Sequence, residues 1–345
     1  MQLIKPPALT PGATIGIFTP SSPAHVKFRE KYLHGIAVLK KMGFQVIEGS
    51  LTASQKSEGY RSGSPQERAD EFMELIRNPQ VTCMISTIGG MNSNSMIPFL
   101  DFDEIRRNPK IICGYSDVTS LHLSILAYAG LRTFYGPAVM PSFGEWPDIL
   151  EETKESFLDA VQKHRSGTRR LTPPPRWSYH LRAYASGAWK TEPRKFEENP
   201  GWKALNPGES SAPIVVANLN TLMSSAGTTY FPKLEGKILL IEEMSAPLSL
   251  EERSLRHLER LGVFDVITGL IIGKPEVYNG EDAPFGYDDL IMEIVGRNRK
   301  YPIVSNFDCG HTNPTLTIAE MTQVSLAAKT GYQTSVTINE PMVDG

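Results

Sequence analysis

The sequence has few cysteines and no long apolar run. Its three cysteines, Cys83, Cys113 and Cys309, are far apart, and each lies in or beside an apolar strand-like run. This pattern is typical of reduced thiols in a cytoplasmic protein rather than of a disulfide framework. No apolar run approaches the roughly 20 residues that a membrane-spanning helix needs, and the opening MQLIKPP lacks the basic and apolar stretches of a secretory signal. We therefore expect a cytoplasmic protein without a membrane partner.

The charge balance also lacks a strong bias. The 345 residues include 35 Lys and Arg and 38 Asp and Glu, which gives a formal net charge of −3. A strongly basic surface is the usual mark of a nucleic-acid-binding protein, so we expect no nucleic-acid partner. No tract of low complexity interrupts the chain, and its length suits two domains rather than one.

The first half of the chain alternates between strand and helix patterns. Strands are predicted at 13–19, 44–47, 81–87 and 110–113, and helices at 28–42, 65–77 and 118–129. Ser64, Pro65 and Glu67 have the spacing of a capping box that opens the second of these helices. Strands separated by helices of this length predict an α/β fold with a doubly wound parallel sheet, which we assign to an N-terminal domain over residues 1–165.

The pattern changes after that domain. Residues 166–211 hold three consecutive prolines and three of the four tryptophans without lasting periodicity, which indicates a linker and an ordered cover. Regular patterns return afterwards, with strands predicted at 214–217, 237–241, 266–272, 302–307 and 324–327 and helices at 250–261 and 287–295. We expect a smaller C-terminal α/β domain over residues 212–345.

Ser116 lies between the predicted strand at 110–113 and the helix at 118–129. A serine on such a turn reaches the rim of the sheet, where the free N–H groups of the helix can stabilise an oxyanion. The segment Gly114-Tyr115-Ser116-Asp117-Val118 lacks the second glycine of a G-x-S-x-G elbow. From the local sequence alone, helix capping by Ser116 is the commoner role, and a nucleophile is the alternative.

A glycine pair favours the catalytic interpretation. Gly89 and Gly90 follow the strand at 81–87, and the carboxyl ends of parallel strands meet at one edge of a sheet. Such a pair lets a backbone N–H approach a substrate oxygen, so the N–H groups of Gly90 and Asp117 are candidate oxyanion donors. A tight turn without a ligand is the alternative.

A serine nucleophile needs a base and a carboxylate that orients it. Among the seven histidines, His311 stands in a polar loop with glycine and proline directly after an apolar strand, which is typical of a presented side chain. A metal site with Cys309 is the alternative, although Cys-x-His lacks the rest of a four-ligand set. Glu242 and Glu243 end the strand at 237–241 and point to opposite faces, so only one of them can orient the base.

The order and spacing of these segments resemble those of the LD-carboxypeptidase family of serine peptidases, and most closely its microcin C self-immunity branch. The resemblance runs nearly end to end and includes IGIFTPSSP, STIGGMNSNSMIPFLDFDEI, IICGYSDVTSLHLSI, VVANLNTL, KILLIEE and FDCGHTNP. It implies a triad of Ser116, Glu242 and His311, with oxyanion donors at Gly90 and Asp117. It also implies a homodimer that needs neither a metal nor an organic cofactor.

The resemblance further implies the class of substrate. The family removes a C-terminal residue from a short peptide-like substrate, and the immunity branch cleaves the amide between a peptidyl aspartate and a modified nucleotide. Gly89 belongs to the loop that approaches the substrate, and Asn218 and Asn220 match positions that face it. Trp177 and Trp189 lie in the stretch that corresponds to a base-stacking loop, with packing onto the protein body as the alternative.

Two other functions remain open at this point. Met91 and Ser95 stand where many murein-type relatives have an aromatic residue and an arginine, so the choice between a nucleotide amide and a murein tetrapeptide is unresolved. A nucleotide-binding α/β protein without catalysis, in which Ser116 caps a helix, is an alternative from another class.

Overall fold

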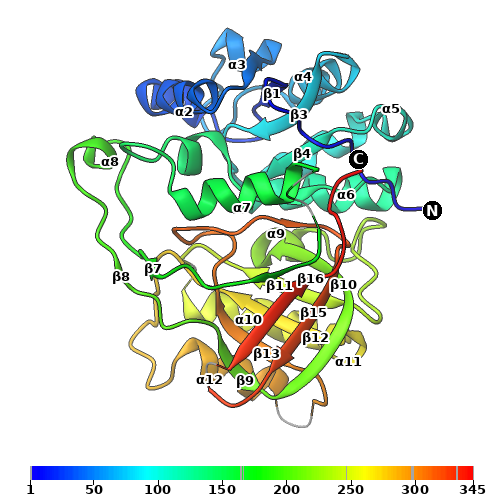
Figure 1. The fold of residues 1–345 in the computed structure, drawn as a ribbon, viewed down its shortest axis with the longest axis vertical. Coiled ribbons are helices and arrows are strands. Elements are labelled where there is room, and N and C mark those ends of the chain that lie inside the picture. Colours follow the sequence, from blue (N-terminus) through cyan, green and yellow to red (C-terminus); the bar gives the residue numbers. More distant parts are fainter. Residues whose placement is uncertain are drawn as a thin grey trace.

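The computed structural model describes residues 2–163, 165, 167–245, 247–296, 299–331 and 333–344. It contains two β-sheets with helices packed around them, one sheet built mainly from the first half of the chain and the other from the second half (Figure 1). This mixed α/β arrangement confirms the predicted fold class. The two ends of the chain lie close together, and Asp344 donates its N–H to the carbonyl of Pro6.

Among the described residues, the first sheet has six strands in the order β14-β5-β4-β3-β1-β2. Its strands are β1 Thr14–Phe18, β2 Gln45–Glu48, β3 Val81–Ser86, β4 Ile111–Gly114, β5 Phe134–Tyr135 and β14 Ile318–Ala319. Neighbours are parallel except for β14 and β5, which are antiparallel. The parallel order brings the carboxyl ends of β3, β4 and β5 to one edge, as the sequence predicts.

Helices connect the parallel strands of this sheet. They are α1 Ala24–Lys27, α2 Arg29–Lys41, α3 Ser50–Ser54, α4 Pro65–Arg77, α5 Phe102–Arg107 and α6 Thr119–Ala129, with the short elements η1 Ser93–Phe99 and η2 Ser116–Val118. The elements η3 Val139–Phe143 and α7 Glu151–Val161 follow β5. The predicted capping box is present, since the Glu67 N–H donates to Ser64 Oγ and the Ser64 N–H donates to Glu67 Oε2.

The second sheet has eight strands within the described ranges, in the order β6-β16-β15-β10-β11-β12-β13-β9. Its strands are β6 Arg169–Leu171, β9 Lys203–Asn206, β10 Gly208–Asn218, β11 Ile238–Glu242, β12 Gly269–Gly273, β13 Ile303–Phe307, β15 Gln323–Ala328 and β16 Thr334–Ile338. The four strands β10 to β13 are parallel, and their carboxyl ends share one edge. Helices beside this sheet are α9 Leu219–Ser224, α10 Leu248–Arg260, α11 Val263–Val266, α12 Tyr287–Ile291 and η4 Met292–Gly296.

The segment predicted as a linker and cover has more regular structure than its composition indicates. Strands β6 and β9 form the two edges of the second sheet. Between them lie a small antiparallel pair, β7 Arg176–Trp177 and β8 Glu197–Glu198, and the short helix α8 Ala188–Thr191. The segment therefore covers one side of the molecule and also completes a sheet (Figure 1).

A continuous apolar core holds the two sheets together. Alternate residues of β1 and β3, such as Ile15 and Cys83, pack in one cluster with Ile214 of β10, Leu240 of β11 and Phe157 of α7. The intervening strand residues face the opposite side of each sheet, because side chains alternate along a strand. This shared core fixes the edge of the first sheet relative to that of the second.

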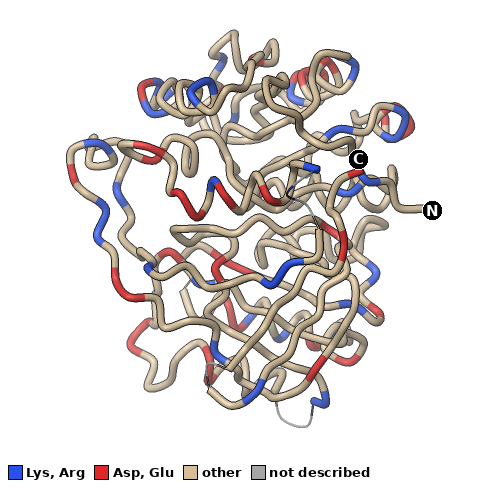
Figure 2. Tube along the Cα trace, in the orientation of Figure 1, with Lys and Arg blue, Asp and Glu red and all other residues tan. Residues whose placement is uncertain are grey.

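Charged residues of both signs are distributed along the whole trace (Figure 2). No helix among the described residues is both long enough and apolar enough to cross a membrane.

Candidate active site

The turn after β4 carries Ser116. The strand ends at Gly114, η2 begins at Ser116, and Ser116 has a φ of +66°, in the left-handed region that side-chain-bearing residues rarely adopt. A Cβ atom at Gly114 would lie 2.5 Å from Ser86 Oγ, so this close approach requires glycine. Within the described residues Ser116 caps neither η2 nor α6, which removes the structural basis for the capping alternative. Ser116 instead lines a cavity of about 490 Å³.

The glycine pair lies against this turn and lines the same cavity. A Cβ atom at Gly89 would lie 2.9 Å from Ser116 Cβ and 3.2 Å from the backbone nitrogen of Asp117. Gly90 has a φ of +154°, and a Cβ atom there would lie 2.2 Å from Ser21 Oγ. Gly89 therefore lies directly against the Ser116 turn and Gly90 lines the same cavity, and the role of the Gly90 and Asp117 N–H groups in catalysis stays a prediction.

The Asp117 carboxylate has a structural role that the sequence analysis missed. Its Oδ2 accepts the backbone N–H groups of Asn92 and Ser93 at 2.8 and 2.9 Å, at the start of η1. The buried guanidinium of Arg68 holds the same loop, donating to Asn92 Oδ1 at 2.9 Å and to the carbonyl of Pro20 at 2.6 Å. Both contacts fix the loop that contains the glycine pair beside the serine turn.

Glu242 ends β11 and is 2% exposed. Its Oε2 accepts the backbone N–H of His311 at 2.8 Å and lies 2.7 Å from His311 Nδ1. Its Oε1 accepts the Tyr135 hydroxyl at 2.5 Å and Asn218 Nδ2 at 3.2 Å. Burial raises the pKa of Glu242, but the charge of His311 and the hydrogen bonds from His311 and Tyr135 outweigh it, so the net pKa is lowered. The carboxylate is therefore ionised and held at both oxygens.

Glycine makes room for this buried carboxylate. Gly310 has a φ of +87°, and a Cβ atom there would lie 2.2 Å from Glu242 Cδ. A Cβ atom at Gly273 would lie 2.6 Å from Glu242 Cβ. The loop that carries His311 can approach Glu242 only because these two positions have no side chain.

His311 lies in the loop after β13 and lines the same cavity as Ser116. Burial lowers the pKa of His311, but the Glu242 charge and its hydrogen bond outweigh burial and raise the net pKa above the ordinary value. The ring of Tyr115 packs edge-on against the imidazole, with centroids 4.9 Å apart. His311 and Ser116 make no direct hydrogen bond in this structure; both line the same open cavity.

The remaining predicted residues lie outside the cavity. Glu243 accepts the backbone N–H groups of Asn220 and Met244 at 3.1 and 3.0 Å, so the carboxylate that contacts His311 is that of Glu242. Asn220 is exposed, and Asn218 contacts Glu242 and caps α9 through Thr221. The structure thus gives Asn218 a role behind the carboxylate rather than facing the cavity.

The two tryptophans of the cover segment also lie away from Ser116. Trp189 is buried, with the Lys31 ammonium 4.7 Å from its ring centroid. Trp177 is partly buried, with the Lys274 ammonium 5.1 Å from its ring. Neither ring lines the Ser116 cavity, whose wall from this segment is residues 181–185, although Trp189 lines a small adjoining cavity together with His311. The packing alternative accounts for both rings, and base stacking by either stays a prediction.

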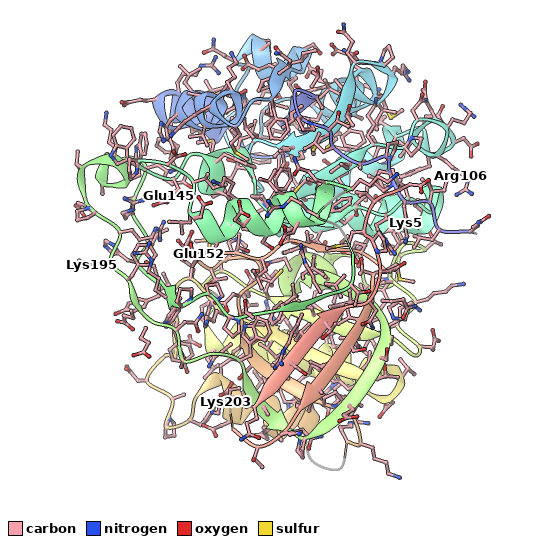
Figure 3. The ribbon with its side chains drawn as sticks, viewed as in Figure 1. Lys5, Arg106, Glu145, Glu152, Lys195 and Lys203 are labelled. Atoms are coloured by element: carbon pink, nitrogen blue, oxygen red, sulfur yellow. The ribbon has the colours of Figure 1, made fainter. Side chains whose placement is uncertain are left out.

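Three features near the cavity were not found from the sequence. Tyr135, at the end of β5, accepts the Ser116 N–H at 3.1 Å and donates to Glu242. Glu276, three residues beyond β12, lines the cavity beside His311. Glu145 forms buried ion pairs with Arg182 and Arg194, and it lies between α8 and the start of α7 (Figure 3). The available signal was position at a strand end for Tyr135 and Glu276; nothing local marked Glu145.

Within the parts of the chain that the structure describes, no group of three or more His, Cys, Asp or Glu side chains is placed to hold a metal ion. Burial raises the pKa of the Cys309 thiol well above its ordinary value, and His311 Nδ1 contacts Glu242. The Cys309 and His311 metal alternative therefore has no support from the geometry.

Comparisons with known proteins agree with this geometry. Residues 15–136 match the LD-carboxypeptidase N-terminal domain, and residues 211–326 match the LD-carboxypeptidase C-terminal domain. The chain is 40% identical over 311 residues to a putative carboxypeptidase of Vibrio cholerae, covering 90% of each chain. It is 39% identical over 311 residues to the microcin C7 self-immunity protein MccF of Escherichia coli, covering 90% of this chain and 89% of the relative.

A solved structure of MccF in complex with aspartyl sulfamoyl adenosine superposes with a TM-score of 0.90 at 35% sequence identity, covering 99% of this chain and 100% of MccF. The fold, the two matched domains and the identity to these relatives agree over nearly the whole chain. The chain therefore belongs to the LD-carboxypeptidase family of serine peptidases.

Proposed function

We propose that the protein is a serine carboxypeptidase or amidase that cleaves the C-terminal amide of a short peptide-like substrate, with Ser116 as nucleophile, His311 as base and Glu242 as the carboxylate that orients the base. One observation carries this proposal. Glu242 Oε2 lies 2.7 Å from His311 Nδ1, and His311 lines the same cavity as a serine on a strained strand–helix turn. A base oriented by a buried carboxylate is the arrangement that activates a serine hydroxyl.

The hydrogen bond to Glu242 determines which nitrogen of His311 reacts. Because Nδ1 carries the proton donated to Glu242, Nε2 is free to accept the proton of Ser116 Oγ. Ser116 attacks the scissile carbonyl carbon, and His311 then gives the proton to the leaving amine. Water resolves the acyl-enzyme with His311 again as base, and the serine hydroxyl is regenerated.

The oxyanion of the tetrahedral intermediate needs N–H donors. We assign this role to the backbone N–H groups of Gly90 and Asp117. The proximity of Gly89 to the nitrogen of Asp117, and the contacts of Asp117 and Arg68 with the loop, support a fixed arrangement of these donors. Fixed donors lower the barrier because they need no reorganisation during the reaction.

The proposed substrate is an aminoacyl or peptidyl nucleotide amide of the microcin C type, and the biological role is then detoxification of such a compound. Support comes from the relative that is named as a microcin C7 self-immunity protein and binds aspartyl sulfamoyl adenosine. The cover segment that forms one wall of the cavity gives such a ligand a surface to contact. A murein tetrapeptide is the competing substrate within the same chemistry.

Hydrolysis of an aspartyl-nucleotide amide and of a murein LD-tetrapeptide, measured side by side, tests the proposal. We expect turnover of the nucleotide amide and its loss in Ser116→Ala, whose folding and ligand binding stay largely intact. Near-normal turnover by Ser116→Ala would contradict the proposed nucleophile. Faster cleavage of the tetrapeptide would support the murein alternative and leave the mechanism in place.

A further inference from the structure

The cavity around Ser116 and His311 has mainly apolar walls. Phe28, Ile88, Tyr115, Pro141, Leu181 and Met244 are among the side chains that form them. The ionisable groups that line it besides His311 and the tyrosines are Arg182 and Glu276. Glu276 also lines a small adjoining cavity of about 40 Å³, again together with His311. A carboxylate in such apolar surroundings is costly unless a partner compensates its charge.

Glu276 has little compensation from the protein. Its Oε1 accepts one hydrogen bond, 3.3 Å from Asn313 Nδ2. Across the described residues, no lysine, arginine or histidine side chain lies within 4 Å of its carboxylate oxygens, although neighbouring acids such as Glu145 and Asp308 have such partners. Glu276 is thus a cavity carboxylate without an ion-pair partner of its own.

The cations near the cavity are already bound elsewhere. Arg182 and Arg194 both pair with Glu145, and the Arg194–Glu145 contact measures 2.9 Å. Lys31 donates to the carbonyl of Gly144 at 2.7 Å and lies 4.7 Å from the ring centroids of Tyr184 and Trp189. Each of these three cations has its own contact and none forms an ion pair with Glu276, which leaves the carboxylate open to a cation carried by a ligand.

The electrostatic environment agrees with a missing cation. Burial raises the pKa of Glu276. The charges of His311 and Arg194 and the hydrogen bond from Asn313 lower this pKa by less, so the net pKa is raised. The nearby Glu145 charge adds to the increase. An ammonium group placed beside the carboxylate would reverse this balance and favour the ionised form.

We infer that Glu276 binds an ammonium group of the substrate beside His311, so that the enzyme prefers amides whose acyl part carries a free amine. The inference rests on the proposed function and makes it more specific. In an aminoacyl nucleotide the ammonium group is the α-amine, and an N-acylated peptidyl nucleotide lacks it. Glu276 is then a specificity residue that touches the substrate without taking part in the proton transfers.

A pair of substrates and a pair of variants test this role. The substrates are aspartyl sulfamoyl adenosine and the same compound acetylated on its amine. We expect kcat/KM of the wild-type enzyme to be about tenfold to a hundredfold higher for the free amine, as for a charged hydrogen bond in a cavity. Glu276→Gln keeps the shape and an acceptor for Asn313, and we expect it to bring the ratio to within about twofold of one.

Glu251→Gln is the matched control. Glu251 is another buried carboxylate, with its pKa raised by burial to about 8, and it lines a separate small cavity with Tyr287. We expect this variant to keep the wild-type ratio of kcat/KM values. An equal loss of the ratio in both variants would overturn the assignment, because the effect would then be a general consequence of removing a buried acid.

The same assay separates failure of this inference from failure of the proposed function. Equal kcat/KM values of the wild-type enzyme for the two substrates would overturn the amine site and leave the hydrolase in place. If neither substrate were cleaved, the proposed substrate class would fail instead. Titration calorimetry of Ser116→Ala with the two compounds then tests Glu276 alone, and equal affinities would overturn its role.

Discussion

The hydroxyl of Tyr135 lies between Ser116 and Glu242. It accepts the Ser116 N–H at 3.1 Å and donates to Glu242 Oε1 at 2.5 Å. Burial and then the Glu242 charge raise the pKa of Tyr135 well above its ordinary value, so the phenol stays protonated and remains a donor. A single oxygen therefore supports the strained backbone of Ser116 and shares the charge of the Glu242 carboxylate.

Tyr135→Phe removes this oxygen and keeps the ring. We expect kcat to fall about tenfold to a hundredfold with KM nearly unchanged, since a buried hydrogen bond to a charged group is lost. The acid limb of the kcat/KM profile moves to higher pH, because Glu242 no longer shares its charge and stabilises the imidazolium more strongly. Tyr128→Phe, whose hydroxyl bonds to Thr229 outside the cavity, should change neither quantity. An unmoved acid limb in Tyr135→Phe would contradict the positioning role.

With the roles proposed above, the charge of Glu242 sets the pH range of activity. His311 accepts a proton only when neutral, so kcat/KM falls as the pH drops through its pKa, which lies above the ordinary value for histidine. Glu242→Gln removes the charge that raises this pKa and leaves the burial that lowers it. We expect the acid limb to move to lower pH and kcat to fall by about 10⁴-fold, as for the comparable change in other serine triads. An acid limb at the wild-type position would assign it to a group other than His311.

At the level of loops and strands, Gly310, which precedes His311, allows the His311 loop to approach Glu242 closely. Gly310→Ala would put a Cβ atom 2.2 Å from Glu242 Cδ at a φ of +87°, and we expect kcat/KM to fall more than about a hundredfold as the loop moves. Gly12→Ala is the control, with a similar φ of +77° and open space around the new atom. It should lower stability by about 1 kcal/mol and leave activity intact. Comparable activity of the two variants, measured after both are checked by circular dichroism, would contradict the close-approach argument.

The longer apolar strands and several of the longer helices could be predicted from periodicity, because β1, β3, β4 and β11 are apolar and α4 has a capping box, whereas the 11-residue helix α7 lies outside the predicted helices. Three edge strands, β6, β9 and β14, could not, whereas the edge strand β2 matches the strand predicted at 44–47. β6 has three residues, β14 has two, and β9 follows a proline- and tryptophan-containing stretch, so none carries a recognisable period. Their positions depend on pairing with residues about 100 or more positions away along the chain.

The site residues that lie at or just after the end of a strand could be predicted from the sequence. Ser116, His311 and the Glu242–Glu243 pair all follow apolar runs, and residues that follow parallel strands share the carboxyl edge of a sheet. The choice of Glu242 over Glu243 depends on the approach of Gly310, which is a tertiary contact. The roles of Tyr135 and Glu276 depend on partners from the other half of the chain or on a cavity, and single-sequence patterns do not contain this information.

The whole molecule is held together in part by a buried ion pair behind the His311 loop. Lys274 and Asp308 lie 2.7 Å apart, and Asp308 also accepts from Trp202 Nε1 at 2.8 Å and from Asn199 Nδ2 at 3.1 Å. Burial lowers the pKa of Lys274 and raises that of Asp308, and each charge partly offsets the effect on its partner. The pair joins the end of β12, the His311 loop and the cover segment.

Lys274→Met leaves the Asp308 charge buried without its cation. We expect the free energy of unfolding to fall by about 3–5 kcal/mol, which urea unfolding followed by tryptophan fluorescence measures. Arg77→Ala, which removes an exposed ion pair with Glu104 on the surface, serves as the control and should leave the unfolding midpoint nearly unchanged. Equal midpoints for the two variants would contradict the importance of the buried pair.

Some properties of the whole molecule stay predictions from the sequence. The homodimer is tested by sedimentation velocity, and the cytoplasmic location by fractionation of cells that express the chain. The domain bounds at residues 165 and 212 also stay predictions, tested by limited proteolysis. Strand β14 lies in the predicted C-terminal domain but pairs with β5 of the first sheet. If this pairing is strong, we expect the fragment that contains β14 to stay bound to the first sheet after cleavage near residue 212.

The order of the chain has a consequence for biosynthesis. Ser116 and Tyr135 emerge from the ribosome early, whereas His311 and the strand β14 that closes the first sheet emerge nearly 200 residues after Ser116. With the roles proposed above, a nascent chain has a nucleophile without a base until that late segment is complete. On this proposal the enzyme stays inert throughout most of its translation and becomes active only when its last elements fold.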